Sequence, residues 1–494
     1  MVKRFICGRV FGAIALIGLS NTLLAQETEY QKWLKKEQEK LQQFRDERDK
    51  EFTEFLKREW REMQSFRGLV PDETPKPVRM PVYQSPPRPP KDTSSKPTVI
   101  KEIPAPRQIS GAATKDAPQP VISKAKNQNT LDLSFFGAPV TLQYDNAIMP
   151  TLSARLNKEA ISDFWAALSR SNYEDLLAQV QYDRSQMRLN DWGYTLLLNR
   201  IGRSLFSDSH NEATLFVWFM LAKSGYDVKV GYNSDQLHLL LPTENSLYCV
   251  PYFSFANDQR RFYAVTLDPG DKPFEGSLYT YEGKYPGAEK NADFAVKSLP
   301  SLRREIAARK LSFSYNNKEY AFDVKLSKDA VGFFRDYPQT NFEVYFEASP
   351  SPEAVQSLLT QLKSIVQGKS EWEAVNIVLR FLQTAFEYKT DPEQFGREKP
   401  LFPDETLFYP FSDCEDRAIL FAYLVRHMLG LDVVALDYPG HIATAVMFSA
   451  DIAGDSIVFH GKKYIICDPT YVNADVGACM TQFKDVKPGV IAIH

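Results

Sequence analysis

The chain has 494 residues and a formal net charge of −3, with 59 basic and 62 acidic residues. This length suffices for two or three domains with sizeable cores. The balanced charge lacks the basic excess typical of nucleic-acid-binding domains, so we expect no nucleic-acid partner.

The N-terminus has the pattern of a secretory signal peptide. Basic residues, among them Lys3 and Arg4, precede the apolar run 10–19, and Ala25 ends a short stretch suited to cleavage. The apolar run is too short to span a bilayer comfortably. The sequence thus predicts a signal peptide over residues 1–25. It also predicts a secreted protein, periplasmic or associated with the cell envelope, with no integral membrane segment after cleavage.

Residues 26–68 predict a long, charged amphipathic helix. Apolar residues recur every eleven positions on two neighbouring lines, a period that keeps them on one face of a straight helix. These residues are Tyr30, Leu41, Phe52 and Met63 on one line, and Trp33, Phe44, Phe55 and Phe66 on the other. Because exposed aromatic stripes usually mark contacts, the helix over residues 29–66 should pack against something. The candidates are a second copy, the body of the protein or another envelope component.

A proline-rich segment separates this helix from the rest of the chain. Residues 69–129 include Pro86-Pro87-Arg88-Pro89-Pro90. Such a composition buries too little apolar surface to fold and favours an extended, disordered spacer.

Three residues of complementary chemistry follow at even spacing near the C-terminus. Cys414 lies five residues before the start of the apolar run 419–429, His441 comes 27 residues after the cysteine, and Asp468 comes another 27 residues after that. A thiolate at the start of a buried helix is favoured by the helix dipole. An imidazole and a carboxylate are the groups that activate such a nucleophile. We therefore predict a catalytic triad of Cys414, His441 and Asp468.

The setting of these residues resembles the transglutaminase-like superfamily, which has a papain-like fold. The order cysteine, histidine, aspartate matches it, and Asp413-Cys414-Glu415-Asp416 is similar to the motif of bacterial transglutaminase-like cysteine proteinases. The resemblance is strong over residues 370–469. It implies an α+β fold in which a central helix packs on an antiparallel sheet. It also implies a cysteine peptidase or amidase that cleaves an amide bond of a protein or peptide through a thioester.

Two other functions stay open at this point: a transamidase that cross-links proteins, and a non-catalytic envelope scaffold. No cofactor and no metal ligand is predicted. Some relatives with this motif depend on calcium through acidic residues near the cysteine, which leaves calcium as an alternative.

An internal repeat covers most of the remaining chain. Phe206-Ser207-Asp208-Ser209 aligns with Phe411-Ser412-Asp413-Cys414, and the register holds without a gap to Gly225 and Gly430. We therefore expect two transglutaminase-like domains, a degenerate one over residues 130–300 and a catalytic one over residues 301–494. The alignment gives the degenerate site Ser209, His238 and Asp268.

An insertion of about twenty residues, 389–410, precedes the cysteine motif only in the second copy. Its aromatic residues Phe395, Phe402 and Tyr409 predict a substrate-binding loop, and a plain surface loop is the alternative. Between the copies, aromatic content and alternation predict strands over residues 311–323 and 341–348.

Overall fold

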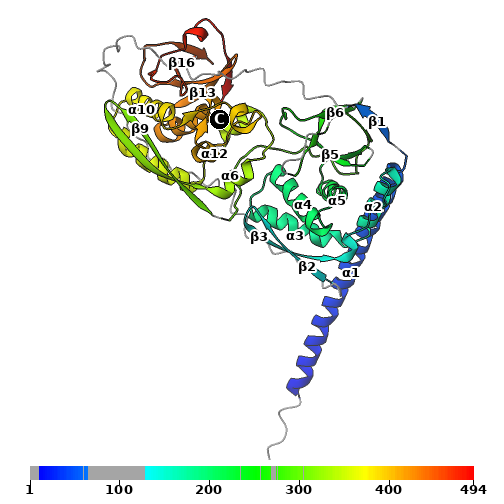
Figure 1. Ribbon diagram of the computed structural model, residues 1–494. Helices are drawn as coiled ribbons and strands as arrows, with labels where there is room; N and C mark the ends of the chain where they lie inside the picture. The colour runs from blue at the N-terminus through cyan, green and yellow to red at the C-terminus, as the bar shows by residue number, and fades with distance from the viewer. Residues whose placement is uncertain are drawn as a thin grey trace, which may run out of the picture.

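The computed structural model describes residues 11–58, 60–64, 128–233, 235–255, 257–268, 274, 276–303 and 305–494, without the side chains of 11–31, 61, 62, 64 and 128. Residues 1–10 of the predicted signal peptide and nearly all of the predicted linker 69–129 lie outside this description. The fold is mixed α+β, with two main antiparallel sheets that belong to two bodies lying side by side (Figure 1). We call residues 128–303 the N-terminal body and residues 305–494 the C-terminal body.

The N-terminal body is built on a six-stranded antiparallel sheet of order β1-β8-β4-β5-β7-β6. Its strands are β1 Arg61–Gln64, β4 Lys229–Tyr232, β5 Leu237–Pro242, β6 Tyr252–Phe255, β7 Asp258–Val265 and β8 Ser277–Thr280. The other elements are the hairpin β2 Gln128–Phe135 and β3 Ala138–Asp145, the short turn η1 Asn146–Ile148, and the helices α2 Lys158–Ser169, α3 Tyr173–Gln186, α4 Asp191–Leu205 and α5 His210–Lys223. Helix α5 is buried from Ala213 to Ala222 and forms the centre of this body.

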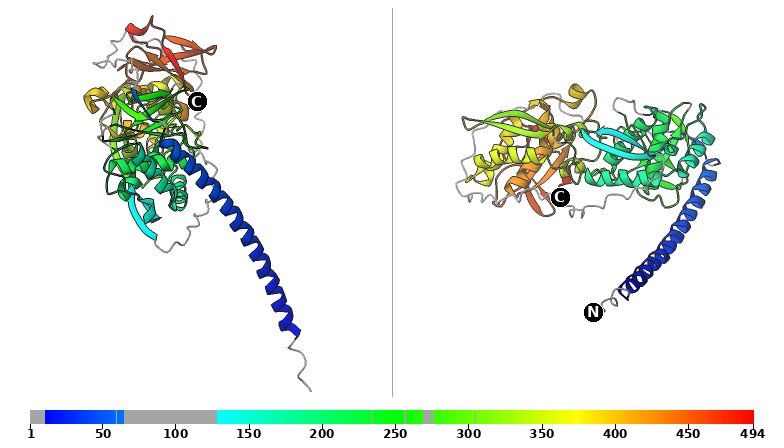
Figure 2. Two further views of the ribbon diagram at one scale, coloured as in Figure 1. Left: turned by 90° about the vertical axis from the view of Figure 1, so that its right-hand side faces the viewer. Right: turned by 90° about the horizontal axis from the view of Figure 1, so that it is seen from below.

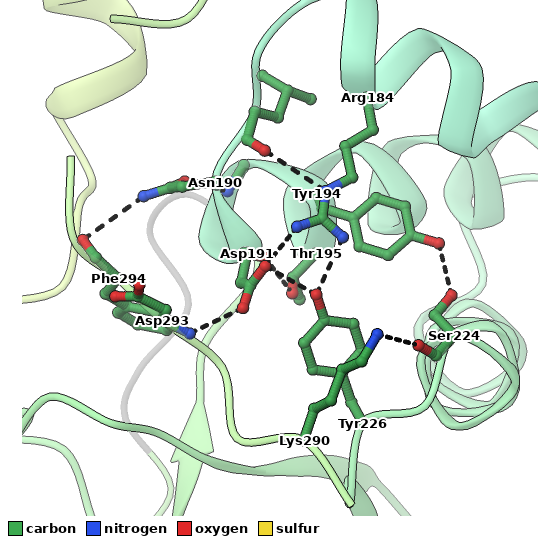
Figure 3. Close-up of polar contacts among 12 residues, drawn as sticks. Arg184, Asn190, Asp191, Tyr194, Thr195, Ser224, Tyr226, Lys290, Asp293 and Phe294 are labelled. Carbon is green, nitrogen blue, oxygen red and sulfur yellow. Dashed lines mark hydrogen bonds and ion pairs between the residues drawn. The ribbon is translucent and has the colours of Figure 1, made fainter. Parts of the chain in front are cut away.

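A polar network fastens the start of α4 to its neighbours (Figure 3). Asp191 accepts hydrogen bonds from the guanidinium of Arg184, from the hydroxyl of Tyr226 at 2.7 Å and from the backbone N–H of Asp293 at 2.8 Å. A largely buried carboxylate with three donors is well satisfied, and each donor comes from a different segment. The network therefore ties α3, α4 and two loops into one body.

The C-terminal body is built on a five-stranded antiparallel sheet of order β15-β16-β14-β13-β17. Its strands are β13 Asp432–Tyr438, β14 His441–Met447, β15 Ser456–Phe459, β16 Lys462–Cys467 and β17 Gly489–Ala492. A long hairpin, β9 Ile306–Tyr315 and β10 Lys318–Ser327, and a short parallel pair, β11 Glu387–Tyr388 and β12 Phe411–Ser412, lie outside this sheet.

The helices of the C-terminal body gather around one buried helix. That helix is α13 Cys414–Leu424, continued by the π turn η3 Val425–Leu429, and all eleven residues of α13 are buried. The others are α6 Lys328–Phe334, α7 Phe342–Glu347, α8 Pro352–Ala354, the π turn η2 Val355–Leu359, α9 Thr360–Val366, α10 Glu371–Thr384, α11 Asp391–Phe395, α12 Pro403–Phe408 and the short turn η4 Thr481–Phe483. Helix α13 packs against β14.

Helix α1, Phe11–Leu56, joins the N-terminal body at only one end. Phe52 is 4% exposed and its ring packs against the rings of Trp165 and Tyr285. Asp49 forms a buried ion pair with Lys223 of α5. Toward the N-terminus, α1 projects away from both bodies (Figures 1 and 2). The body of the protein thus covers one end of the predicted aromatic stripe, and Trp33, Leu34, Leu41 and Phe44 remain exposed.

Three sequence-based assignments need correction. The helix predicted over residues 29–66 ends at Leu56, because Arg61–Gln64 pairs with the edge strand β8. The strand predicted over 311–323 is part of a hairpin whose turn contains Asn316 and Asn317, both left-handed. Residues 341–348 contain the short helix α7 instead of a strand. In the described part of the chain, no helix combines the length and the apolar character needed to cross a membrane.

Candidate active site

Cys414 is the first residue of α13, as the motif predicts. The preceding residue, Asp413, has an extended backbone, and its N–H donates to Oδ2 of Asp416 at 3.2 Å, which fixes the helix start. The thiol of Cys414 is fully buried and donates to Oε2 of Glu415 at 3.2 Å. The thiol therefore lies where the helix dipole favours an anion, with a carboxyl group directly beside it.

His441 and Asp468 form a buried hydrogen-bonded pair. His441 opens β14 directly after Gly440, whose φ of 76° is left-handed, and its Nε2 lies 2.7 Å from Oδ2 of Asp468. The other oxygen of Asp468 accepts from the backbone N–H groups of Thr470 and Tyr471, at 2.9 and 3.1 Å. These bonds fix the carboxylate, which in turn fixes the imidazole ring.

The second ring nitrogen of His441, Nδ1, is buried and has no hydrogen-bond partner among the described residues. Within the described residues, Nδ1 of His441 thus makes no hydrogen bond to Cys414, although α13 and β14 pack against each other. His441 and Asp468 are 1% and 3% exposed, and the ring of Phe483 lies parallel to that of His441 at 5.4 Å. The arrangement is closed, and a substrate could reach the thiol only after a local rearrangement.

Acidic side chains crowd the start of α13. Carboxylate oxygens of Asp391, Asp413 and Asp416 lie within 4.8 Å of one another, as do those of Asp391, Glu398 and Glu415. Burial and the charges of Asp416 and Glu415 raise the pKa of Asp391 to about 10. Burial raises the pKa of Asp416 to about 7, and the charge of Glu415 adds to the effect. Burial followed by repulsion from Glu415 raises the pKa of Asp413 well above its usual value. We call Asp391, Glu398, Asp413, Glu415 and Asp416 the acidic cluster, in which burial and mutual repulsion favour protonation of Asp391, Asp413 and Asp416.

The acidic cluster has the chemistry of a hard-cation site. All its donors are oxygen atoms, which calcium prefers, and both carboxylate oxygens of Asp413 are buried without a hydrogen-bond partner in the described structure. The residues present therefore fit a calcium ion. The sequence suggested acidic residues near Cys414, but not Asp391 and Glu398, which the inserted loop brings in from a distance.

The buried side chain of Arg417 supplies positive charge near the acidic cluster. Arg417 donates to Oγ of Ser412 at 3.0 Å and to the backbone carbonyls of Gln383 and Phe386 at 3.3 and 3.0 Å. Burial lowers the pKa of Arg417 to about 10, so its guanidinium is charged at neutral pH. It partly offsets the negative charges next to the thiol.

The predicted degenerate site does not assemble in the N-terminal body. Ser209 precedes α5 and donates to Glu212. The ring of His238 lies 4.5 Å from that of Phe274, and burial lowers the pKa of His238 to about 4. Asp268 pairs with Arg203. Within the described part of the chain, no hydrogen bond or ion pair joins any two of Ser209, His238 and Asp268.

Asp268 is held instead by α4 and by His210. It accepts a hydrogen bond from Nδ2 of Asn199 at 2.9 Å, and Nδ1 of His210 lies 3.7 Å from it. Although burial would raise the pKa of Asp268, the bonds from His210, Arg203 and Asn199 lower it below its usual value. The carboxylate is thus locked into an ion pair with Arg203.

The positions at which α5 and α13 begin explain why the alignment without a gap paired Ser209, and not His210, with Cys414. Helix α5 begins at His210 and is followed by left-handed Gly225, whereas α13 begins at Cys414 and is followed by left-handed Gly430. The second interval is one residue longer, and α13 continues into a π turn, which accommodates one extra residue. By position on the helix, His210 corresponds to Cys414 and Ser209 to Asp413.

The three aromatic residues of the predicted substrate loop have different surroundings. Phe402 is 1% exposed and stacks on Phe334 at 4.0 Å, so it belongs to the core and offers no surface to a substrate. Phe395 and Tyr409 contact each other edge to face at 5.3 Å and are partly exposed. Only these two could contact a bound molecule.

No family model and no curated protein matches this sequence. The function is therefore argued from the geometry of the site.

Proposed function

We propose that the protein is a secreted cysteine peptidase or amidase of the transglutaminase-like type, with Cys414, His441 and Asp468 as its catalytic triad. The hydrogen bond between His441 and Asp468, beside the helix that begins with Cys414, is the observation that carries this proposal. Its N-terminal pattern supports export to the periplasm or cell envelope. A degenerate transglutaminase-like copy in the N-terminal body is part of the same proposal.

In the proposed mechanism, Nδ1 of His441 accepts the proton of the Cys414 thiol. Asp468 holds Nε2, which keeps the proton-accepting nitrogen directed away from the carboxylate and stabilises the imidazolium that forms. The thiolate attacks an amide carbonyl, the amine leaves with the proton from His441, and water hydrolyses the resulting thioester. The backbone N–H of Cys414 is available to stabilise the oxyanion.

Asp391 would hold a calcium ion either with Asp413 and Asp416 or with Glu398 and Glu415. When bound, the ion would supply positive charge beside a nucleophile that is otherwise surrounded by carboxyl groups. The Cys414 thiol donates a hydrogen bond to Glu415, which belongs to the acidic cluster, so positive charge at the cluster would act directly beside the thiol.

A non-catalytic envelope scaffold is the second candidate. The closed arrangement of the triad favours it, because Cys414 is 0% exposed and its thiol contacts Glu415 instead of His441. Cross-linking of proteins by transamidation would need the same thioester and differs only in the acceptor.

Competition between cysteines within the chain tests the proposal. Iodoacetamide at mildly acidic pH reacts slowly with ordinary thiols, and Cys249 is an internal reference for a solvent-exposed thiol. Faster labelling at Cys414 than at Cys249, abolished by His441→Ala, would support an enzyme. Labelling of Cys249 alone would support the scaffold. Incorporation of a fluorescent amine into acceptor proteins would identify a transamidase.

A further inference from the structure

A cavity of about 1050 Å³ lies at the junction of the two bodies. Its wall combines α4 and the end of β7 from the N-terminal body with α6, residues 335–339 and the inserted loop from the C-terminal body. We call it the junction cavity. Much of its lining is apolar and aromatic, including Phe136, Trp192, Val265, Leu267, Phe333 and Tyr337. A cavity of this size accommodates several side chains of a ligand.

Four arginines and the four acidic residues Asp208, Asp268, Asp336 and Glu398 line the same cavity, and two of the arginines lack a carboxylate partner. Arg203 is paired with Asp268 and Arg335 with Asp336. Arg200 makes no hydrogen bond or ion pair within the described residues. Within the described residues, Arg397 donates only to the backbone carbonyl of Arg335, at 3.4 Å. Because guanidinium groups bind carboxylates in forked geometry, Arg200 and Arg397 are suited to two acidic groups of a ligand.

The junction cavity reaches the acidic cluster through the inserted loop. Arg397 is followed by Glu398, which also lines the cavity and whose carboxylate lies within 4.8 Å of those of Asp391 and Glu415. Glu415 in turn accepts the hydrogen bond from the Cys414 thiol at 3.2 Å. A ligand that moves Arg397 would therefore also move a carboxylate two contacts away from the nucleophile.

We propose that the junction cavity binds an acidic polypeptide segment with interspersed apolar side chains, and that this occupant alters the reactivity of Cys414. The proposed effect on the reactivity of Cys414 rests on the proposed peptidase function, whereas the binding of the polypeptide segment does not. Arg200 and Arg397 are two guanidinium groups without a carboxylate partner, one from each body. They favour a ligand with several carboxylates over a fatty acid with one. The apolar walls between them suit the intervening side chains.

Peptide binding to the full-length chain carrying Cys414→Ala tests the site without turnover. The probes are fluorescein-labelled Glu-Phe-Glu-Leu-Glu and its matched control Lys-Phe-Lys-Leu-Lys, measured by fluorescence anisotropy. We expect the acidic peptide alone to bind. Arg200→Gln combined with Arg397→Gln should weaken it at least about tenfold, since two charge-assisted contacts are lost. The matched control, Arg155→Gln with Arg170→Gln, replaces two exposed arginines outside the cavity and should leave the affinity unchanged.

A filling substitution tests the location independently of charge. A Cβ at Gly332 would meet only the ring of Phe136, at 3.8 Å, so Gly332→Leu should extend into the cavity without a clash. We expect it to abolish binding without lowering the melting temperature. Equal binding of both peptides, unchanged binding by the two cavity variants, or binding of dodecanoate instead of the acidic peptide would overturn the proposal.

The iodoacetamide labelling rate at Cys414, with and without the acidic peptide, tests the coupling in the wild-type chain. A changed rate that disappears in the double arginine variant supports it. An unchanged rate while the peptide is bound overturns the coupling. If Cys414 never reacts faster than Cys249, the peptidase proposal fails, whereas peptide binding to the junction cavity is still measured by anisotropy.

Discussion

His441 opens β14, Asp468 directly follows the neighbouring strand β16, and they meet through a 2.7 Å hydrogen bond between Nε2 and Oδ2, with both side chains almost fully buried. Asp468→Asn should keep an acceptor for the N–H groups of Thr470 and Tyr471 but remove the charge that orients the imidazole. We expect amide hydrolysis to fall on the order of 10²- to 10⁴-fold, with little change in stability. Hydrolysis of a fluorogenic peptide and thermal unfolding check this. Asp485→Asn, at an exposed position, should have neither effect.

Glu415→Gln should make Cys414 more reactive. The amide can still accept the hydrogen bond of the thiol, but the negative charge next to the developing thiolate is gone. In chelator-treated protein, iodoacetamide labelling of Cys414 should accelerate about tenfold, because one adjacent charge changes an acid dissociation constant by about that factor. Glu319→Gln on the exposed face of β10 is the matched control. Slower labelling in Glu415→Gln would mean that the carboxylate itself assists deprotonation.

Asp404 should make the C-terminal body less stable as the pH rises. Its buried carboxyl group accepts from the backbone N–H groups of Ser351 and Ser327, and burial raises its pKa to about 6. Because the folded pKa exceeds the unfolded one, the stabilisation is complete below about pH 4 and is lost as the pH rises through about 6.

The free energy of unfolding of the wild-type protein should therefore fall by up to about 3 kcal/mol between about pH 4 and pH 7. The Asp404→Asn variant should not show this fall. Urea unfolding at both pH values measures it. Asp323→Asn, on the exposed side of β10, should keep the wild-type pH dependence. An identical slope in Asp404→Asn would show that other groups cause the pH effect.

Phe52 should be essential for the attachment of α1. Its ring contacts four aromatic residues of the N-terminal body, Trp165, Trp218, Tyr281 and Tyr285. Phe52→Ala should lower the free energy of unfolding by about 3–5 kcal/mol, as for other buried aromatic truncations. Phe44→Ala, at a 51% exposed position on the same helix, should change it by less than about 0.5 kcal/mol. Hydrogen exchange along α1 would separate detachment of the helix from unfolding of the body.

The sequence was sufficient to predict the parts of the site that depend on local signals. The apolar run 419–429 was enough to predict a helix start at Cys414, and α13 begins at that residue. The hydrogen bond between His441 and Asp468 agrees with the predicted pairing. Local capping and turn chemistry determine these features, so they can be read without tertiary information.

Long-range contacts determine what the sequence could not reveal. Residues 61–64 continue a helical pattern, but the free edge of β8 pairs with them and overrides it. Asp391 and Glu398 join the acidic cluster only because the inserted loop folds back onto the start of α13. Phe402 resembles a loop residue in the sequence, yet it fills a core position against Phe334. The turn at Asn316 and Asn317, by contrast, was a local signal that the sequence analysis overlooked.

The π turn at the end of α13 also sets how the start of that helix is oriented relative to the chain that follows it. Deleting one residue from Val425–Leu429 would leave a regular α-helix and would rotate Cys414 by about 100° relative to Gly430 and the strand after it.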